Sequence, residues 1–566
     1  MKSKILRRII NLALAAVMVF SVGSFVGCSK DKVVRDGKTV NIRTYRAGYG
    51  VEWVYELQQK FESVYKEQGY KINVLTPSSD MRNNVALTDM ALGNVTTGVD
   101  LYLIGGVGAD SVGENGDYGV LAEDIEQIVY TQKPIGYDGV EEDKTIKDKL
   151  SSTVTADLRD GKGVMYGFNW ATSSAGLVVN TKKLARYELS LPRTTNEMFA
   201  AFDKIYKTSK QTSIYPVTYV SGTNGYVNCA LGSWHAQYDY EGFNKFWSMT
   251  DEGLPMIGNG YEVFGGDAIE SMLSIGYHAM DWRIAASGST SQELDQAQSQ
   301  IMDTNRGAVF MFNGDWMLNE VKANYLEELD DIEFINTPVN SDVGLKLFGP
   351  GTAYDLSESE ADKLLSGIIS KVDENASVED IVAAFADYNL TAQDATVVAQ
   401  TRGLTYCRGT EQLAYIAKDS PVKDIAALVL RMMASDDFAE TFATTANCAT
   451  PYAFDANITN KYKFVRQSFA IVQNRYYKAI VNNAKGFRKT LGITSYLTNV
   501  SHLPSKMYNS GVTMYDGNGG IAQDNAGHDV TAQVYVDAAK ALIKSAHDDA
   551  QSRWNNYLTS AGISKD

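Results

Sequence analysis

Residues Arg306–Val321 read RGAVFMFNGDWMLNEV and combine a strand, a turn and the start of a helix. The apolar run Ala308–Phe312 predicts a buried strand, and Asn313-Gly314 predicts the turn that follows it. Asp315 is the expected N-cap of the helix, because its carboxylate can accept a backbone N–H of the first turn. This order places Asp315 and Trp316 at the carboxyl end of a strand, where open α/β sheets bind their ligands.

An indole beside a carboxylate suits a neutral sugar. The ring can stack on the apolar face of a pyranose, while the acid accepts hydrogen bonds from hydroxyls. Two plainer interpretations stay open. Trp316 could be a core residue, since tryptophan is usually largely buried, and capping alone would account for Asp315.

The length and charge of the chain limit its architecture and partners. At 566 residues it exceeds one ordinary core, so two or three lobes are expected. The formal net charge is −16, and the first 27 residues hold four basic side chains and no acid, so the remainder carries −20. Such an acidic body argues against nucleic acid or an anionic lipid surface as a partner. The 33 tyrosines suit a protein that holds sugars or peptides.

The N-terminus has the pattern of a secretion signal. Basic residues precede the apolar run Ile9–Phe20, which is too short to span a bilayer comfortably. The sequence then ends Phe25-Val26-Gly27-Cys28, which resembles the lipobox of bacterial lipoproteins, although Phe25 departs from the usual Leu. We therefore expect a signal peptide over 1–27, lipidation of Cys28 and a tether over 28–38. The mature protein would be anchored at the extracellular face of the bacterial cytoplasmic membrane.

No motif predicts a metal or a cofactor. The five histidines lack HxxxH or HExxH spacing. The glycines of Gly105–Gly108 fail the dinucleotide pattern, and Gly37–Thr39 lacks the upstream glycine of a phosphate loop. Three cysteines remain without CxxC spacing, which favours three buried thiols over one disulfide and one free thiol: Cys229, Cys407 and Cys448.

The first part of the chain alternates strands and helices. Apolar strands are expected near Val40–Tyr45, Lys71–Thr76 and Asp100–Ile104, with helical segments between them, which predicts an α/β sheet with right-handed crossovers. Tyr45 and Tyr49 lie in or beside a glycine-rich turn and off the apolar stripe of the next helix. Both are therefore candidates for contact with a ligand.

A second informative segment is Gly163–Leu184, which is apolar and extended and carries Trp170 among small residues. Trp234 follows in a helical segment. Both indoles are candidates for ligand contact. Asp281 and Arg283 flank a further tryptophan and could form a salt bridge, which is the favoured interpretation, or meet a ligand hydroxyl. The remaining tryptophans with helical spacing are expected in the core: Trp53, Trp247 and Trp554.

Taken together, these motifs resemble the family 1 extracellular solute-binding proteins of ABC importers, the carbohydrate-binding type that includes maltose-binding proteins. The resemblance covers most of residues 38–460. It is carried by the lipobox, the first strand and turn, and the segments GFNWATSSAGLVVNTKKL, LPRTTNEM, NGDW and YIAKDSPVKDIAALVLRMM.

The resemblance implies a type II periplasmic-binding-protein fold, in which two α/β lobes are joined by hinge strands and the sugar lies in the cleft. Lobe 1 is expected over 39–175 and again over 406–460. Lobe 2 would span 176–405, with an insertion at 341–402, and would include a helical C-terminal part over 461–566.

The resemblance also implies site residues and a function. Trp316 corresponds to the tryptophan that stacks on sugar, Trp170 to the aromatic of the crossing segment and Tyr49 to the first-turn position, while Trp234 matches loosely. The protein would be a monomeric, non-catalytic and cofactor-free receptor. It would bind a neutral mono- or oligosaccharide and deliver it to ABC permease subunits.

Two other functional classes stay open. A secreted glycoside hydrolase would need two carboxylates facing a sugar, and with 68 acidic residues a pair cannot be ruled out from the sequence, although no catalytic motif stands out. A lipid-anchored protein for peptide binding or sensing would favour a charged site. The candidate site is mostly uncharged and aromatic, which disfavours that class.

Overall fold

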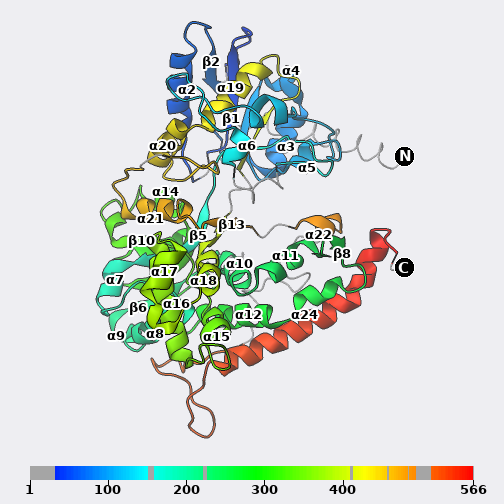
Figure 1. Ribbon diagram of the computed structural model, residues 1–566. Helices are drawn as coiled ribbons and strands as arrows, with labels where there is room; N and C mark the ends of the chain where they lie inside the picture. The colour runs from blue at the N-terminus through cyan, green and yellow to red at the C-terminus, as the bar shows by residue number, and fades with distance from the viewer. Residues whose placement is uncertain are drawn as a thin grey trace. The chain divides into compact units, whose positions relative to one another are not determined.

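The structure is a computed structural model of the chain (Figure 1). The predicted signal peptide and Cys28 lie outside the residues that it describes. No helix within the described residues is long and apolar enough to cross a membrane. The described residues are 32–46, 48–78, 80–150, 158–220, 226–407, 412–455, 458–481, 484–491 and 511–564.

The chain divides into two compact units. Unit 1 comprises Met1–Ser173 and Arg408–Asn460, and unit 2 comprises Ser174–Cys407 and Lys461–Asp566. The chain therefore passes three times from one unit to the other, after residues 173, 407 and 460. Each unit has its own sheet and its own hydrophobic core.

Unit 1 contains a five-stranded sheet in the order β2-β1-β3-β12-β4. β1 runs parallel to β2 and β3, as expected for strands joined by helical crossovers, whereas β12 is antiparallel to both of its neighbours. The antiparallel strand belongs to the segment that returns from unit 2. The strands are β1 (Thr39–Thr44), β2 (Lys71–Val74), β3 (Leu101–Gly105), β4 (Phe168–Asn169) and β12 (Gln412–Ile416), and the crossover helices are α2 (Glu52–Val64), α3 (Asn83–Ala91) and α4 (Gly93–Thr97).

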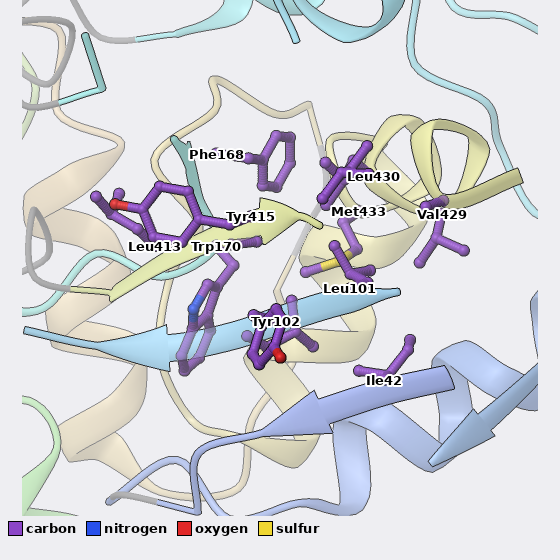
Figure 2. Close-up of a cluster of buried hydrophobic side chains, with 14 of the residues drawn as sticks. Ile42, Leu101, Tyr102, Phe168, Trp170, Leu413, Tyr415, Val429, Leu430 and Met433 are labelled. Atoms are coloured by element: carbon purple, nitrogen blue, oxygen red, sulfur yellow. The ribbon is translucent and has the colours of Figure 1, made fainter. Parts of the chain in front are cut away.

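The core of unit 1 joins residues that are far apart in the sequence. Trp53, Leu57 and Phe61, which the helical spacing placed on one face of α2, are fully buried. Figure 2 shows another part of this core, where strand side chains meet those of α19 (Lys423–Met433). Full burial of one such aliphatic or aromatic side chain contributes about 1.5–3 kcal/mol relative to exposure.

Unit 2 is built on a sheet in the order β13-β11-β5-β9-β6, with β10 also paired to β5. β5 is antiparallel to β9, β10 and β11, and β9 is parallel to β6. Every residue of β5 is buried, so this strand reads as a continuous apolar run and not as an alternation. The strands are β5 (Ser174–Asn180), β6 (Ile214–Thr218), β9 (Gly307–Gly314), β10 (Ile332–Ile335), β11 (Leu404–Cys407) and β13 (Lys478–Ile480).

The segment Ser341–Arg402 is a helical part of unit 2 with a hydrophobic core of its own. Its helices are α15 (Asp342–Phe348), α16 (Glu358–Asp373), α17 (Val378–Ala384) and α18 (Ala392–Gly403). Near the C-terminus, α21 (Lys463–Val472) packs on β10, and the long helix α24 (Gln533–Ser560) packs along α12 (Asp267–Ala279). In Figure 1 α24 is the red helix at the edge of this unit.

The expected N-cap at Asp315 is wrong. The helix α14 covers Met317–Val321, its N-cap position is Trp316, and no side chain caps it. Asp315 instead extends the pairing of β9 with β5. Its backbone N–H donates to the Ser174 carbonyl at 3.0 Å, and its Oδ2 accepts the Ser174 N–H at 3.1 Å. The carboxylate thus satisfies the first donor of β5.

Candidate ligand-binding site

Trp316 follows β9 at the carboxyl end of that strand and lies in an aromatic cluster within unit 2. Its side chain is 8% exposed and packs with Ala175 and Cys229. Two half-buried tyrosines, Tyr226 and Tyr406, pack on the same cluster. The ring centroids of Tyr226 and Trp316 are 5.1 Å apart with planes inclined by 60°. This is the kind of apolar, aromatic lining that small-molecule sites use.

Gly314 fixes the position of the indole. A Cβ atom at Gly314 would overlap the six-membered ring of Trp316, so the ring lies directly on the glycine backbone. The glycine of the NGDW motif is therefore required for this close approach. Any larger residue would push the indole out of its position.

Asp315 and Ser174 add unpaired polar atoms beside this cluster. Both residues are almost completely buried. The Asp315 Oδ1 and the Ser174 Oγ have no hydrogen-bond partner among the described residues. Because buried polar atoms are nearly always hydrogen-bonded, these two atoms indicate a missing partner, such as a ligand hydroxyl or an ordered water.

Burial raises the pKa of Asp315 to about 8, even though the backbone N–H groups of Ser174 and Trp316 favour the ionised form. The carboxyl group is therefore mostly protonated at neutral pH. In that state it can donate one hydrogen bond and still accept others. A neutral group of this kind fits a neutral ligand better than an anionic or cationic one.

In unit 1, Trp170 is a core residue of this structure. Its side chain is 1% exposed and stacks on Trp53, with ring centroids 5.1 Å apart and planes inclined by 22°. Tyr49 contacts the indole edge-on at 5.2 Å, and its hydroxyl is hydrogen-bonded to the Ser173 Oγ. Figure 2 shows Trp170 among the buried side chains of this unit. Its small neighbours allow close packing and do not expose the ring.

Tyr45 lies at the carboxyl edge of the unit 1 sheet and is half-buried. A Cβ atom on Gly105 would lie 3.1 Å from the Tyr45 ring and 3.2 Å from the Gln412 Oε1, so both side chains cover this glycine. The Gln412 Oε1 is buried without a partner among the described residues. Tyr45 and Gln412 are therefore a second group of candidate ligand contacts, on unit 1.

The remaining predicted site residues serve the packing of unit 2. Trp234, on α10 (Val227–Tyr238), is fully buried and donates its Nε1–H to the Pro338 carbonyl at 3.0 Å. Asp281 accepts hydrogen bonds from the hydroxyls of Thr513 at 2.6 Å and Tyr535 at 3.0 Å. Trp234 is not among the hydrophobic residues packed around Trp316.

Arg283 donates to the Tyr515 carbonyl at 2.8 Å, and its backbone N–H donates to the Asp281 carboxylate at 3.0 Å. The contacts given for Asp281 and Arg283 thus link the turn after α12 to residues 513–535. Asp281 does meet hydroxyls, as one interpretation expected, but they belong to the protein itself.

Sequence reasoning did not single out Tyr226, Tyr406, Ser174 or Gln412. Tyr406 begins the segment that returns toward unit 1, and Tyr226 follows the glycine-containing stretch SGTNG, so an aromatic next to a crossing or a loop was the available signal. Ser174 and Gln412 carry no such signal. Their importance comes from unpaired atoms, which only coordinates reveal.

The three cysteines outside the N-terminal segment are buried. They are Cys229, Cys407 and Cys448. Among the described residues, no group of three or more His, Cys, Asp or Glu side chains is placed to hold a metal ion.

Comparison with known proteins gives a structural result alone. No protein-family model matches the sequence, and no curated protein matches it. The structure does match that of the bacterial solute receptor AcbH, described as having an exclusive preference for β-D-galactopyranose. That match has 10% sequence identity and a TM-score of 0.50, and it covers 91% of this chain and 100% of the receptor.

The chain has the fold of a bacterial solute receptor. The expected fold class is confirmed: the chain has two α/β units, each with a mixed sheet, as in the type II periplasmic-binding-protein fold, and a helical C-terminal part. A family 1 extracellular solute-binding protein from Bifidobacterium longum subsp. infantis is also similar, at 13% identity and TM-score 0.48, over 89% of this chain and 98% of the other. The receptor RafE, solved with raffinose, is similar at 12% identity and TM-score 0.46, over 90% and 99% of the two chains.

Proposed function

We propose that this protein is the lipid-anchored sugar-binding component of an ABC importer. It would capture a neutral mono- or oligosaccharide outside the cell and deliver it to the permease subunits. The observation that carries the proposal is the cluster of Trp316, Tyr226 and Tyr406 beside the unpaired polar atoms of Asp315 and Ser174, on the fold of a solute receptor.

The chemistry of this cluster suits a pyranose. The indole and phenol rings offer apolar faces for the C–H face of the sugar, and the Asp315 and Ser174 atoms offer hydrogen bonds to its hydroxyls. A sugar that lacked the matching hydroxyl would leave one buried atom unpaired, at a cost of about 1–3 kcal/mol. Selectivity would therefore come from the polar atoms of Asp315 and Ser174, and the rings would supply most of the contact area.

The same cluster favours a receptor over a hydrolase. A glycoside hydrolase uses two carboxyl groups that are roughly 5–9.5 Å apart across the scissile bond. The hydrophobic residues packed around Trp316 are aliphatic, aromatic or a thiol, and Asp315 is the carboxyl group that we assign to this site. Capture and release of an unchanged sugar is the function that this set of groups supports.

The anchoring and the partner are proposed from the sequence. The pattern that ends at Cys28 supports export and lipidation, and a lipid-anchored receptor outside the membrane needs a membrane-embedded transporter to use its ligand. On unit 1, Tyr45 and Gln412 are proposed as further contacts, because a half-buried ring and an unpaired acceptor lie together there.

A thermal-shift screen of the chain without its signal segment tests the proposal. The panel would hold neutral mono- and oligosaccharides, acidic sugars and short peptides. A rise in melting temperature with a neutral sugar, followed by recovery of the same sugar unchanged after long incubation, is expected. Stabilisation by peptides alone would contradict the proposal, and so would shortening of the sugar chain.

A further inference from the structure

A cavity of about 760 Å³ opens on unit 2, at the edge of the sheet opposite to Trp316. β6 and β9 are parallel, and residues at their N-terminal ends line it: Tyr215 on β6 and Gly307 on β9. Trp316 follows the other end of β9. At about 3.3 Å per residue, the length of β9 separates the two places by roughly 23 Å. The cavity is therefore distinct from the proposed receptor site.

The floor of the cavity is held by hydrogen bonds of its own. The Gln300 side chain is fixed at both ends, since its Nε2 donates to the Ser287 carbonyl at 2.8 Å and its Oε1 accepts from the Thr218 hydroxyl at 2.6 Å. Below it, the buried Lys183 ammonium donates to the carbonyls of Gln300, Arg306 and Ala308 at 2.6–3.0 Å. A floor fixed in this way is preformed, which lowers the cost of binding.

The walls carry rings and free hydroxyls. Tyr215 and Tyr325 are half-buried and belong to the lining of the cavity. Their hydroxyls form no hydrogen bond with the described residues. Further hydroxyls come from Ser213, Ser287 and Thr304. Rings interspersed with hydroxyls match the alternating apolar and polar surfaces of a sugar.

The charges of the lining largely cancel. Asp303 accepts a hydrogen bond from the Arg306 Nε at 2.7 Å and forms an ion pair with it. Glu328 is the remaining charged group of the lining, and it has no ion pair among the described residues. The cavity therefore lacks the clustered cations that would select an anion. Its volume lies within the range of about 300–1,000 Å³ typical of small-molecule sites.

We propose that this cavity is a second saccharide site, which takes a short neutral sugar independently of the site at Trp316. The rings of Tyr215 and Tyr325 stack on the sugar, and the free hydroxyls bond to it. A second binding site goes beyond the proposed receptor function, because capture of a sugar for import needs only one site. A sugar bound here would also stabilise unit 2 against unfolding.

Isothermal titration of the full mature chain tests the proposal, with raffinose and maltose as neutral probes and the disaccharide of glucosamine as a cationic probe. Trp316→Leu serves as the background, so that binding at the first site does not hide the second. Tyr325→Ala is then added to remove one stacking ring. Tyr388→Ala is the matched control, because Tyr388 is a half-buried tyrosine of the same unit outside the cavity. Glu328→Gln removes the unpaired charge.

A neutral probe should bind the Trp316→Leu protein, and Tyr325→Ala should weaken this binding about tenfold while Tyr388→Ala leaves it unchanged. Glu328→Gln should change the neutral affinity less than about twofold, because an uncharged sugar makes no ion pair. The proposal would be overturned if neither neutral probe bound to the Trp316→Leu protein. It would also be overturned if the affinity for the neutral probe were unchanged by Tyr325→Ala. Preference for the cationic probe, lost in Glu328→Gln, would overturn the assignment of a neutral ligand.

These outcomes separate the two proposals. Binding that disappears completely with Trp316→Leu leaves the receptor function intact and removes the second site. Binding that is unchanged by Trp316→Leu and lost with Tyr325→Ala leaves the second site intact and removes the proposed receptor site at Trp316.

Discussion

Replacing Asp315 with asparagine should change how the stability of the protein depends on pH. Asp315 is 2% exposed, and burial raises its pKa from 3.8 to about 8. Between these two values the folded protein keeps a proton that the unfolded chain has lost. The stabilisation that the protonated Asp315 contributes to the folded protein is therefore complete below pH 4. It decreases as the pH rises and is lost once the pH has passed through the folded pKa near 8.

The size of the effect follows from one proton. A difference of one bound proton changes the free energy of unfolding by about 1.4 kcal/mol per pH unit. The asparagine of the variant does not titrate, and its side-chain oxygen can still accept the Ser174 N–H. The free energy of unfolding of Asp315→Asn minus that of the parent should therefore rise by about 3 kcal/mol between pH 5 and pH 7.

The assay is urea unfolding at pH 5, 6 and 7, followed through the transition of unit 2. Asp516→Asn is the control. Backbone N–H groups, first that of Asn518 and then that of Gly520, hold the pKa of Asp516 below its ordinary value, so this residue is ionised throughout the range. The free energy of unfolding of this control variant should differ from that of the parent by the same amount at each pH. If the free energies of unfolding of Asp315→Asn and of the parent changed in parallel with pH, the reasoning would be refuted. Such a result would show that folded Asp315 is ionised.

Three further predictions concern other groups. Gly314→Ala should displace the Trp316 ring and weaken sugar binding at least tenfold by titration calorimetry, whereas Gly108→Ala, where a Cβ meets nothing within 4 Å, should leave affinity unchanged. Asp281→Ala should destabilise unit 2 by about 1–3 kcal/mol in urea, because Thr513 and Tyr535 lose an acceptor, and a lost affinity in the folded protein would instead mean ligand contact. Burial lowers the pKa of His278 to about 3, so the unfolded chain binds a proton that the folded chain does not, and stability should fall by about 1.4 kcal/mol per pH unit from pH 6 to pH 4. His278→Gln should flatten that slope, and an unchanged slope in this variant would assign the acid sensitivity to other groups.

The sequence predicts the elements of this fold well, because hydrophobic periodicity is a local property. The apolar run of β9, the stripe of α2 and the long amphipathic helix α24 all appear where their patterns indicate. The helical character of Ser341–Arg402 follows for the same reason. The resemblance to solute-binding proteins also gave the correct fold class, since the order of the motifs reflects the order of strands and crossings.

Side-chain roles were harder to predict, because they depend on contacts between distant segments. Trp170 was a candidate for ligand contact, but in the structure its small neighbours allow the indole to stack on Trp53. Asp315 has a good N-cap sequence, yet it bonds to Ser174 because the ladder between β9 and β5 continues to that point. The unpaired atoms of Ser174 and Gln412 leave no trace in sequence periodicity.

The proposed sugar-binding function depends most on the role of Trp316. Trp316→Leu keeps apolar volume in the cluster with Ala175 and Cys229 but removes the aromatic face. The measurement is the dissociation constant of the best-binding neutral sugar, taken beside the melting temperature of the ligand-free protein. Trp234→Leu is the matched control, since this indole is a fully buried core residue bonded to the Pro338 carbonyl.

We expect Trp316→Leu to weaken sugar binding at least tenfold with a small change in melting temperature. Trp234→Leu should lower the melting temperature and leave the affinity of the folded protein unchanged. An affinity retained in Trp316→Leu together with a large loss of stability would make Trp316 a core residue and contradict the central claim.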